Sequence, residues 1–267
     1  MPQPVISQDI IDQVIYALRD DRATLRRCCT VSHAFLIPSR KQLFFEIKFP
    51  FPVRTMGLNS FFHALSIHPE CLSYIRILRI QWLEIEIEKP HFVRLIEDLA
   101  DRRGLQVFTL GMDRLWEELS VPMQAAFVRL FLSPSLHTIG LFFICGQKFP
   151  VHILGLATGL RHLDLRLGEH NRFCHHPTTA SPLIPLAASH DIYLESLEMI
   201  SPTFSVLDGY LSRPDCPLKI SQLRELRINR TQISFCHLIT AASTVMEGAS
   251  RSLESLIWRV DTRRGAH

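Results

Sequence analysis

A group of histidine and cysteine side chains stands out first, because these residue types bind metals and act as nucleophiles. His170, Cys174, His175 and His176 lie close together in the sequence. A tetrahedral zinc site needs four ligands, the adjacent His175 and His176 rarely both reach one ion, and no Cys-x-x-Cys pair lies nearby. The spacing therefore favours a polar loop, and we expect neither a metal nor a cofactor.

The signatures of the common enzyme classes are absent from the sequence. It contains no Gly-x-Ser-x-Gly, no His-Glu-x-x-His and no Gly-Lys-Ser/Thr motif. The seven cysteines are an odd number at long spacings, which is typical of free thiols in a reducing compartment. A cysteine and a histidine brought together by folding would still allow catalysis. The sequence nevertheless predicts a protein that is not an enzyme.

Length, charge and hydrophobicity are those of an ordinary globular protein. The 267 residues are 47% hydrophobic and 21% charged, which is enough to bury a large core without disulfides. A net charge of +3 provides no strong basic field for nucleic acid. The apolar stretch 130–147 contains Ser, Pro and His, so it does not predict a membrane span. We expect a cytoplasmic or nuclear protein whose partners are proteins, with no nucleic acid and no membrane.

The sequence between residues 75 and 258 contains a repeated apolar pattern, which predicts the elements that would form a partner-binding surface. An apolar hexamer, Leu-x-x-Leu-x-Leu with other apolar residues allowed, recurs seven times, and its second position is always polar. The copies span 75–80, 105–110, 136–141, 160–165, 194–199, 223–228 and 253–258. Helix-like stretches lie between them, at 91–102, 122–132, 149–158, 182–189 and 233–246.

A period of about 30 residues with one strand and one helix is typical of leucine-rich repeats. We expect an α/β fold in which about seven strand–helix units stack into a solenoid. The first, fourth and sixth hexamer positions would then share one continuous core. The connection 166–189 is long and rich in His, Pro, Thr and Ser, so we expect it to leave the solenoid as a loop.

The first 45 residues have a helical pattern instead. Apolar residues from Ile10 to Leu18 share one helix face, a second short helix follows Thr24, and a third spans Pro38–Phe45. The alternating Phe and Pro of 49–52 fit neither a helix nor a central strand. The predicted domains are a helical domain at 1–48, a linker and leading helix at 49–70, and the repeat domain at 71–267.

The helical segment resembles the F-box. The resemblance rests on two stretches. They are Pro4, Ile6, Asp9, Ile10, Ile11, Val14, Ile15 and Leu18, followed by Leu25, Cys28, Val31, Phe35, Leu36, Ser39, Arg40, Leu43 and Phe44. The sequence departs from the family pattern at Val5, at Thr30 in place of a usual Leu, and at Phe35 in place of Trp. With the repeats, the chain resembles the short F-box proteins with irregular leucine-rich repeats that are abundant in mushroom-forming fungi.

The resemblance implies a substrate-recognition adaptor of a Skp–cullin–F-box (SCF) ubiquitin ligase. The F-box would dock on a Skp-type adaptor, which a cullin holds, and the repeats would bind a protein substrate. The expected anchors for the Skp-type adaptor are Pro4, Ile6, Ile10, Ile15, Leu25, Val31, Phe35 and Leu36. Helix-in-groove docking uses apolar anchors at this kind of spacing. The alternative is a leucine-rich-repeat scaffold in which the same helices only cap the solenoid.

A substrate would bind the strand face that points away from the core. The third, fifth and seventh hexamer positions lie on that face, which a solenoid makes concave. The candidate substrate-binding residues are Arg79, Thr109, Phe142, His162, Asp164, Arg166, Glu198, Arg227 and Asn229. Glu198 and Arg227 lie on successive strands, so they are also expected to pair with each other. The alternative for this face is an ordinary solvated sheet surface.

Overall fold

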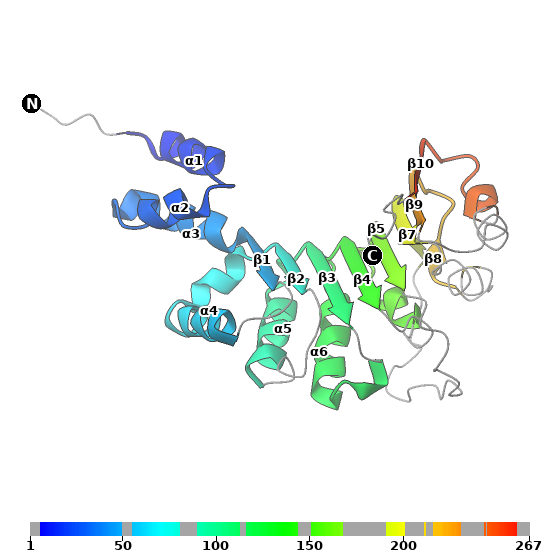
Figure 1. Cartoon of the computed structure of the whole chain (residues 1–267), viewed down its shortest axis with the longest axis horizontal. Helices are drawn as coiled ribbons and strands as arrows, with labels where there is room; N and C mark the ends of the chain where they lie inside the picture. Colours follow the sequence, from blue (N-terminus) through cyan, green and yellow to red (C-terminus); the bar gives the residue numbers. More distant parts are fainter. Residues whose placement is uncertain are drawn as a thin grey trace, which may run out of the picture.

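The computed structural model describes residues 6–49, 55–80, 90–112, 116–143, 151–167, 191–200, 216–230 and 245–260, together with Leu211 and Ser243. These residues form a mixed α/β fold around one eight-stranded parallel sheet (Figure 1). Its strands lie in chain order: β1 (Glu46–Phe49), β2 (Ile77–Ile80), β3 (Val107–Met112), β4 (Thr138–Phe143), β5 (His162–Leu167), β7 (Ser196–Ile200), β9 (Glu225–Arg230) and β10 (Ser255–Val260). All seven predicted hexamers therefore contribute a strand to this sheet.

The segments between strands return the chain to the start of the next strand, as parallel pairing requires. Helices α4 (Thr55–Ile67), α5 (Pro90–Arg102) and α6 (Val121–Phe131) lie on one side of the sheet, as Figure 1 shows. Shorter 3-10 turns complete the connections: η1 (Pro69–Tyr74), η3 (Trp116–Glu118) and η5 (Val151–Leu156). A small parallel pair, β6 (Ile192–Tyr193) with β8 (Leu218–Lys219), lies beside the later strands.

The predicted helices have mixed outcomes. The stretches 91–102 and 122–132 are α-helical almost as predicted, whereas the described part of 149–158, residues 151–158, contains the short η5 in place of an α-helix. The stretch 182–189 lies outside the described residues, and only Ser243 and 245–246 are described within 233–246, where they are helical. A Pro at the start of α6 fits its first turn, because that backbone nitrogen has no hydrogen-bond partner within a helix.

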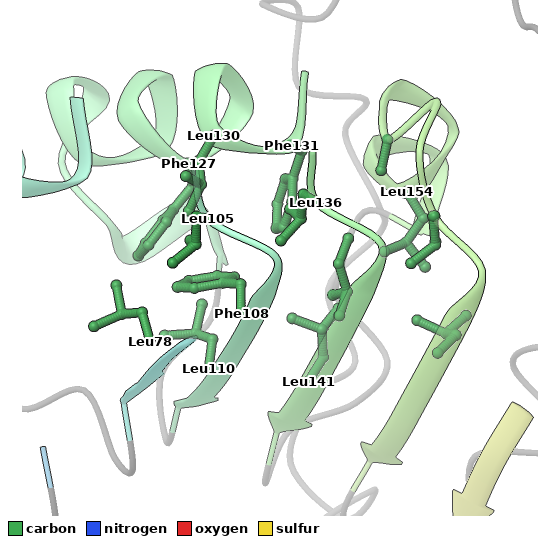
Figure 2. Close-up of a cluster of buried hydrophobic side chains, with 14 of the residues drawn as sticks. Leu78, Leu105, Phe108, Leu110, Phe127, Leu130, Phe131, Leu136, Leu141 and Leu154 are labelled. Atoms are coloured by element: carbon green, nitrogen blue, oxygen red, sulfur yellow. The ribbon is translucent and has the colours of Figure 1, made fainter. Parts of the chain in front are cut away.

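The core lies between the sheet and these helices. In the first six hexamers, the side chains at positions one, four and six are no more than 2% exposed, which confirms the predicted burial pattern. On β3, the ring of Phe108 packs 5.7 Å from Phe127 and 6.0 Å from Phe131, both on α6 (Figure 2). Burying one such side chain contributes about 1.5–3 kcal/mol, so the stacked units share a stabilising interior.

Strand β1 is a feature that the sequence analysis missed. Its residues pair with β2, with Glu46 opposite Ile77 and Phe49 opposite Ile80, so 46–48 belong to the sheet rather than to the helical domain. The segment 44–49 follows the hexamer pattern, because Phe44 packs against the core while Ile47 and Phe49 are buried in it. The apolar Phe45 at position two, together with Pro50, obscured this eighth copy.

The N-terminal helices form a separate unit, made of α1 (Gln8–Ala17), α2 (Arg22–Cys28) and α3 (His33–Phe45). Its small interior contains Ile11, Ile15 and Leu25 and is distinct from the main core. The third helix begins at His33, before the predicted Pro38. Pro38 cannot donate to the carbonyl of Ala34, and the side-chain amide of Gln8 donates to that carbonyl instead, at 3.2 Å.

Helix α3 links the helical unit to the sheet. It runs without a break into β1, and the guanidinium of Arg22 donates to the carbonyl oxygens of Leu43 and Glu46. Arg40 contacts the ring of His68 and the carboxylate of Glu70, beside η1. The sheet is not curled, so its outer face is not the concave surface that the solenoid prediction implied. We call the face opposite α5 and α6 the open face.

Candidate functional site

The first candidate site is an exposed apolar surface on the helical unit. Ile6 is 58% exposed, Ile10 is 54% exposed and Val31 is 65% exposed, and Val14 and Ile37 are exposed as well. These are large aliphatic side chains, and a unit of this size gains stability by covering them. We call Ile6, Ile10, Val14, Val31 and Ile37 the helical apolar surface.

Two parts of this surface meet at one end of the unit. The side chain of Gln8 on α1 donates to the carbonyl of Ala34 near the start of α3. Ile6 is two residues from Gln8, and Val31 is three residues from Ala34. These two exposed side chains therefore lie near the same helix ends, which a single partner can contact.

Two predicted anchors require correction. Ile15 is 1% exposed and Leu25 is fully buried, so neither side chain presents atoms to a partner. They hold α1, α2 and α3 together from inside. Phe35 and Leu36 are half-buried, and Phe35 packs against the same interior. Pro4 lies outside the described residues.

The second candidate site is the open face, where five of the predicted side chains form one closely connected network. Arg166 on β5 lies at its centre. Its guanidinium donates to Asp164 and to Glu198, at 3.1 Å in each case, and stacks 4.7 Å from the ring centroid of Phe142. Asn229 donates to Glu198 at 2.7 Å. The ring and the network therefore form one surface across β4, β5, β7 and β9.

The expected pairing of Glu198 with Arg227 is present but long. The two residues lie directly opposite each other on β7 and β9, yet their closest charged atoms are 3.8 Å apart. Arg227 binds its own strand neighbour Glu225 more closely, at 2.8 Å. The charges of this face are therefore matched within the protein, and a partner would meet hydrogen-bonding groups and the Phe142 ring rather than one strong charge.

A second polar group lies at the β1 end of the open face. Arg79 donates to Glu46 at 2.8 Å and to the hydroxyl of Thr109 at 3.3 Å. Thr109 is only 8% exposed, so its predicted place on the binding surface is corrected to a buried support for Arg79. Gly140 lies opposite Thr109 on β4, and a side chain there would press on the threonine.

The pKa values of two carboxyl groups on this face, Asp164 and Glu46, are shifted in opposite directions. Burial raises the pKa of Asp164, and the contact with Arg166 only partly offsets the rise. Burial also acts on Glu46, but hydrogen bonds from Arg79 and Lys48 outweigh it and lower the pKa of that carboxyl. Neither Glu46 nor Lys48 was among the predicted site residues, because β1 itself was missed.

A polar groove of about 740 Å³ lies at the amino-terminal edge of the sheet. Four of its lining residues, Gln106, His137, Arg161 and Glu195, occupy the polar position two of successive hexamers. Arg161 and Glu195 pair at 3.2 Å. The predicted site residue His162 also lines this groove.

The imidazoles of the groove face each other. The rings of His137 and His162 meet edge to face, with centroids 6.2 Å apart. Burial lowers the pKa of His137, and the neighbouring His162 and Arg161 lower it further, so this ring is neutral at pH 7. A neutral imidazole can both donate and accept a hydrogen bond, so the arrangement suits a polar ligand.

Two further observations concern ligands and membranes. Among the described residues, no group of three His, Cys, Asp or Glu side chains has a geometry that holds a metal ion. The cluster His170, Cys174, His175 and His176 lies outside them. No helix in the part of the chain that the structure describes is long and apolar enough to cross a membrane.

Comparisons with protein-family models, with curated proteins and with solved structures found no match to this chain.

Proposed function

We propose that this protein is a non-enzymatic substrate-recognition adaptor of an SCF-type ubiquitin ligase, located in the cytoplasm or nucleus. The helical unit acts as the F-box and docks on a Skp-type adaptor held by a cullin. The strand–helix units act as an irregular leucine-rich-repeat solenoid, whose open face binds a protein substrate. The observation that carries the proposal is the helical apolar surface, which is exposed on a unit with its own small interior.

The exposure of this surface favours docking over capping. A cap would bury Ile6 and Ile10 against β2, the strand of the first predicted hexamer, yet both side chains are more than half exposed. Apolar anchors spaced four residues apart, such as Ile10 and Val14, are the pattern by which a helix enters a hydrophobic groove. The remaining anchors are therefore Ile6, Ile10 and Val31, with Phe35 and Leu36 partly accessible.

The open face supports the second half of the proposal. Phe142 and Arg166 offer a stacked, half-buried pair, and Glu198 beside them has an 18% exposed side chain. Interfaces concentrate binding energy in such aromatic and arginine side chains. The matched charges of this face indicate recognition by shape and local hydrogen bonds.

The decisive experiment mixes the purified protein with a Skp-type adaptor and measures the complex by size exclusion and calorimetry. We expect a stable one-to-one complex. Val31→Asp should weaken it by about 30-fold, or about 2 kcal/mol, because a charge replaces an apolar anchor in the interface. Val121→Asp is the matched control: the same substitution at a 61% exposed valine on α6 should leave binding unchanged.

Two outcomes would reject the docking role. One is a protein that stays unbound with the adaptor in excess. The other is a complex that Val31→Asp and Val121→Asp affect equally. Ile15→Asp is unsuitable for this test, because it places a charge in the interior and is expected to unfold the helical unit.

A repeat scaffold capped by its N-terminal helices is the second candidate. One observation favours it: α3 continues into β1, and Arg40 ties α3 to His68 and Glu70. A scaffold of this kind would bind its protein partner on the open face without any adaptor. The calorimetric test separates the two candidates, since only the ligase subunit binds the Skp-type adaptor.

A further inference from the structure

On β10, the strand at one edge of the sheet, the apolar side chains that face the core side are partly exposed. In the first six hexamers the side chains at positions four and six are buried, whereas on β10 Leu256 is 48% exposed and Trp258 is 38% exposed. Leu256 lies directly opposite the fully buried Leu226 of β9, so the same pattern has opposite outcomes on neighbouring strands. In the described part of the chain, no strand pairs with the outer edge of β10.

The hydrogen-bonding groups of that edge can be assigned. Ser255 donates its backbone N–H to Arg224 at 2.9 Å, so its backbone polar groups point toward β9. The direction of the backbone N–H and C=O groups alternates along a strand. The backbone groups of Ile257 and Arg259 therefore also point toward β9, whereas those of Leu256 and Trp258 point outward. An edge of this kind can pair with an extended strand. Residues 255–260 contain no lysine, proline or bulge, and Arg259 is their one charged side chain.

We infer that β10 pairs antiparallel with β10 of a second copy of this chain and forms a two-fold symmetric dimer. The pairing centres on Ile257, which lies opposite its own copy. Leu256 then lies opposite Trp258 of the partner, and these two residues exchange both backbone hydrogen bonds. The two sheets become one continuous sheet.

The strand sequence is its own complement in this register. Leu256 and Trp258 form apolar cross-strand pairs on the helix-covered side, where their exposed surfaces need cover. On the other side, Ile257 meets its copy and Ser255 meets the partner's Arg259. No like charges lie opposite each other. A second copy therefore pairs the outward backbone N–H and C=O groups of β10 and also covers the exposed side chains of Leu256 and Trp258.

The first test measures the mass of the full chain by light scattering and sedimentation over a range of concentrations. We expect a dimer, with a mass twice the 30.7 kDa of the chain. Leu256→Pro should give a monomer, because proline removes an outward N–H without removing a bond to β9. Leu132→Lys, at another exposed leucine, is the control and should leave the dimer intact. A wild-type protein that is monomeric at all concentrations overturns the inference.

The second test reports on the register. Residues opposite each other in a non-hydrogen-bonded antiparallel pair have Cα atoms about 4.5 Å apart, within the range of a disulfide. Oxidation of Ile257→Cys should therefore give a disulfide-linked dimer. Ser255→Cys lies on the same strand face but opposite the partner's Arg259, so it should stay monomeric on a non-reducing gel. Equal cross-linking of both variants would reject this register.

A monomeric result would leave adaptor binding unaffected, because the helical apolar surface lies at the β1 end of the sheet and β10 lies at the other end (Figure 1). The inference therefore stands or falls separately from the proposed function.

Discussion

The two ends of the sheet are built from the same hexamer but finished differently. At the β1 end, α3 leads directly into the strand, and the ring of Phe49 packs against Phe61 of α4 and Phe92 of α5. At the β10 end, Trp258 occupies the equivalent position six and is 38% exposed. Position in the stack, rather than residue type, decides which apolar side chains are buried.

This difference assigns separate roles to the ends. The β1 edge carries the charged Glu46 and Lys48, which pair at 2.9 Å, and charge on an edge strand discourages further pairing. The β10 strand carries one charged side chain, Arg259, which the inferred register places opposite Ser255 of the second copy. The β1 end, which we call the covered end, supports the helical unit, whereas the β10 end is suited to pairing with a second copy of the chain.

The largest expected difference comes from truncating position six at the two ends. Phe49→Ala should cost about 3–5 kcal/mol of unfolding free energy, because it removes a buried ring that packs against rings of both α4 and α5. Trp258→Ala should cost less, about 1–3 kcal/mol, because more than a third of that side chain is already exposed. Urea unfolding at low protein concentration, where association contributes little, measures both values. Equal losses would show that Trp258 is covered in solution.

A second comparison uses leucines that lie side by side on β9 and β10. Leu226→Ala should cost about 2–5 kcal/mol, because it leaves a cavity in a closed interior. Leu256→Ala should cost less than about 1 kcal/mol, because that side chain is already half exposed. The same urea experiment reports both losses. A large loss for Leu256 that grows with protein concentration would instead measure its burial in the dimer.

The sequence was sufficient to predict the inner strands, because each hexamer carries three apolar residues in a fixed phase. It could not predict which copy would be left uncovered, since Leu253, Leu256 and Trp258 satisfy the pattern as well as any other copy. Burial of the last copy depends on what stacks beyond it, and that information is not in the hexamer.

The candidate sites were predicted less completely. On α1, Ile10, Ile11, Val14 and Ile15 form a broad apolar face, and periodicity does not show where the partner helices divide it. The structure divides it into a buried pair, Ile11 and Ile15, and an exposed pair, Ile10 and Val14. The open-face residues were found because alternation along a strand fixes their side. Their network depends on rotamers, such as Arg166 turning toward Glu198, that alternation does not specify.

A smaller effect is expected at the contact that ties α3 to the covered end. Arg40→Ala removes the bonds to His68 and Glu70, in a pair whose side chains are 25% and 48% exposed. Partly exposed ion pairs contribute about 0.2–1 kcal/mol, so the loss should lie in that range. Hydrogen exchange should rise more in α3 and η1 than in β9. A uniform rise across the sheet would mean that Arg40 does not act at this end alone.

The smallest effects concern pH and contrast Glu46 at the covered end with Asp164 in the middle of the open face. The folded pKa of Glu46 is lowered, so its contribution to stability is complete above its unfolded pKa and is lost as pH falls through the folded value. The folded pKa of Asp164 is raised, so the folded state binds the proton more tightly. Stability therefore decreases as pH rises from the unfolded pKa of Asp164 through its folded pKa.

The two substitutions should therefore change the acid limb of the stability curve in opposite directions. Glu46→Gln should make stability rise less steeply with pH between about 3 and 6, because it removes a group that releases its proton on folding. Asp164→Asn should make the rise steeper, because it removes a group that retains its proton on folding. Urea midpoints measured across this range test both, with wild type as the reference. Parallel curves for the two variants would show that burial does not dominate at Asp164 while hydrogen bonds from Arg79 and Lys48 dominate at Glu46.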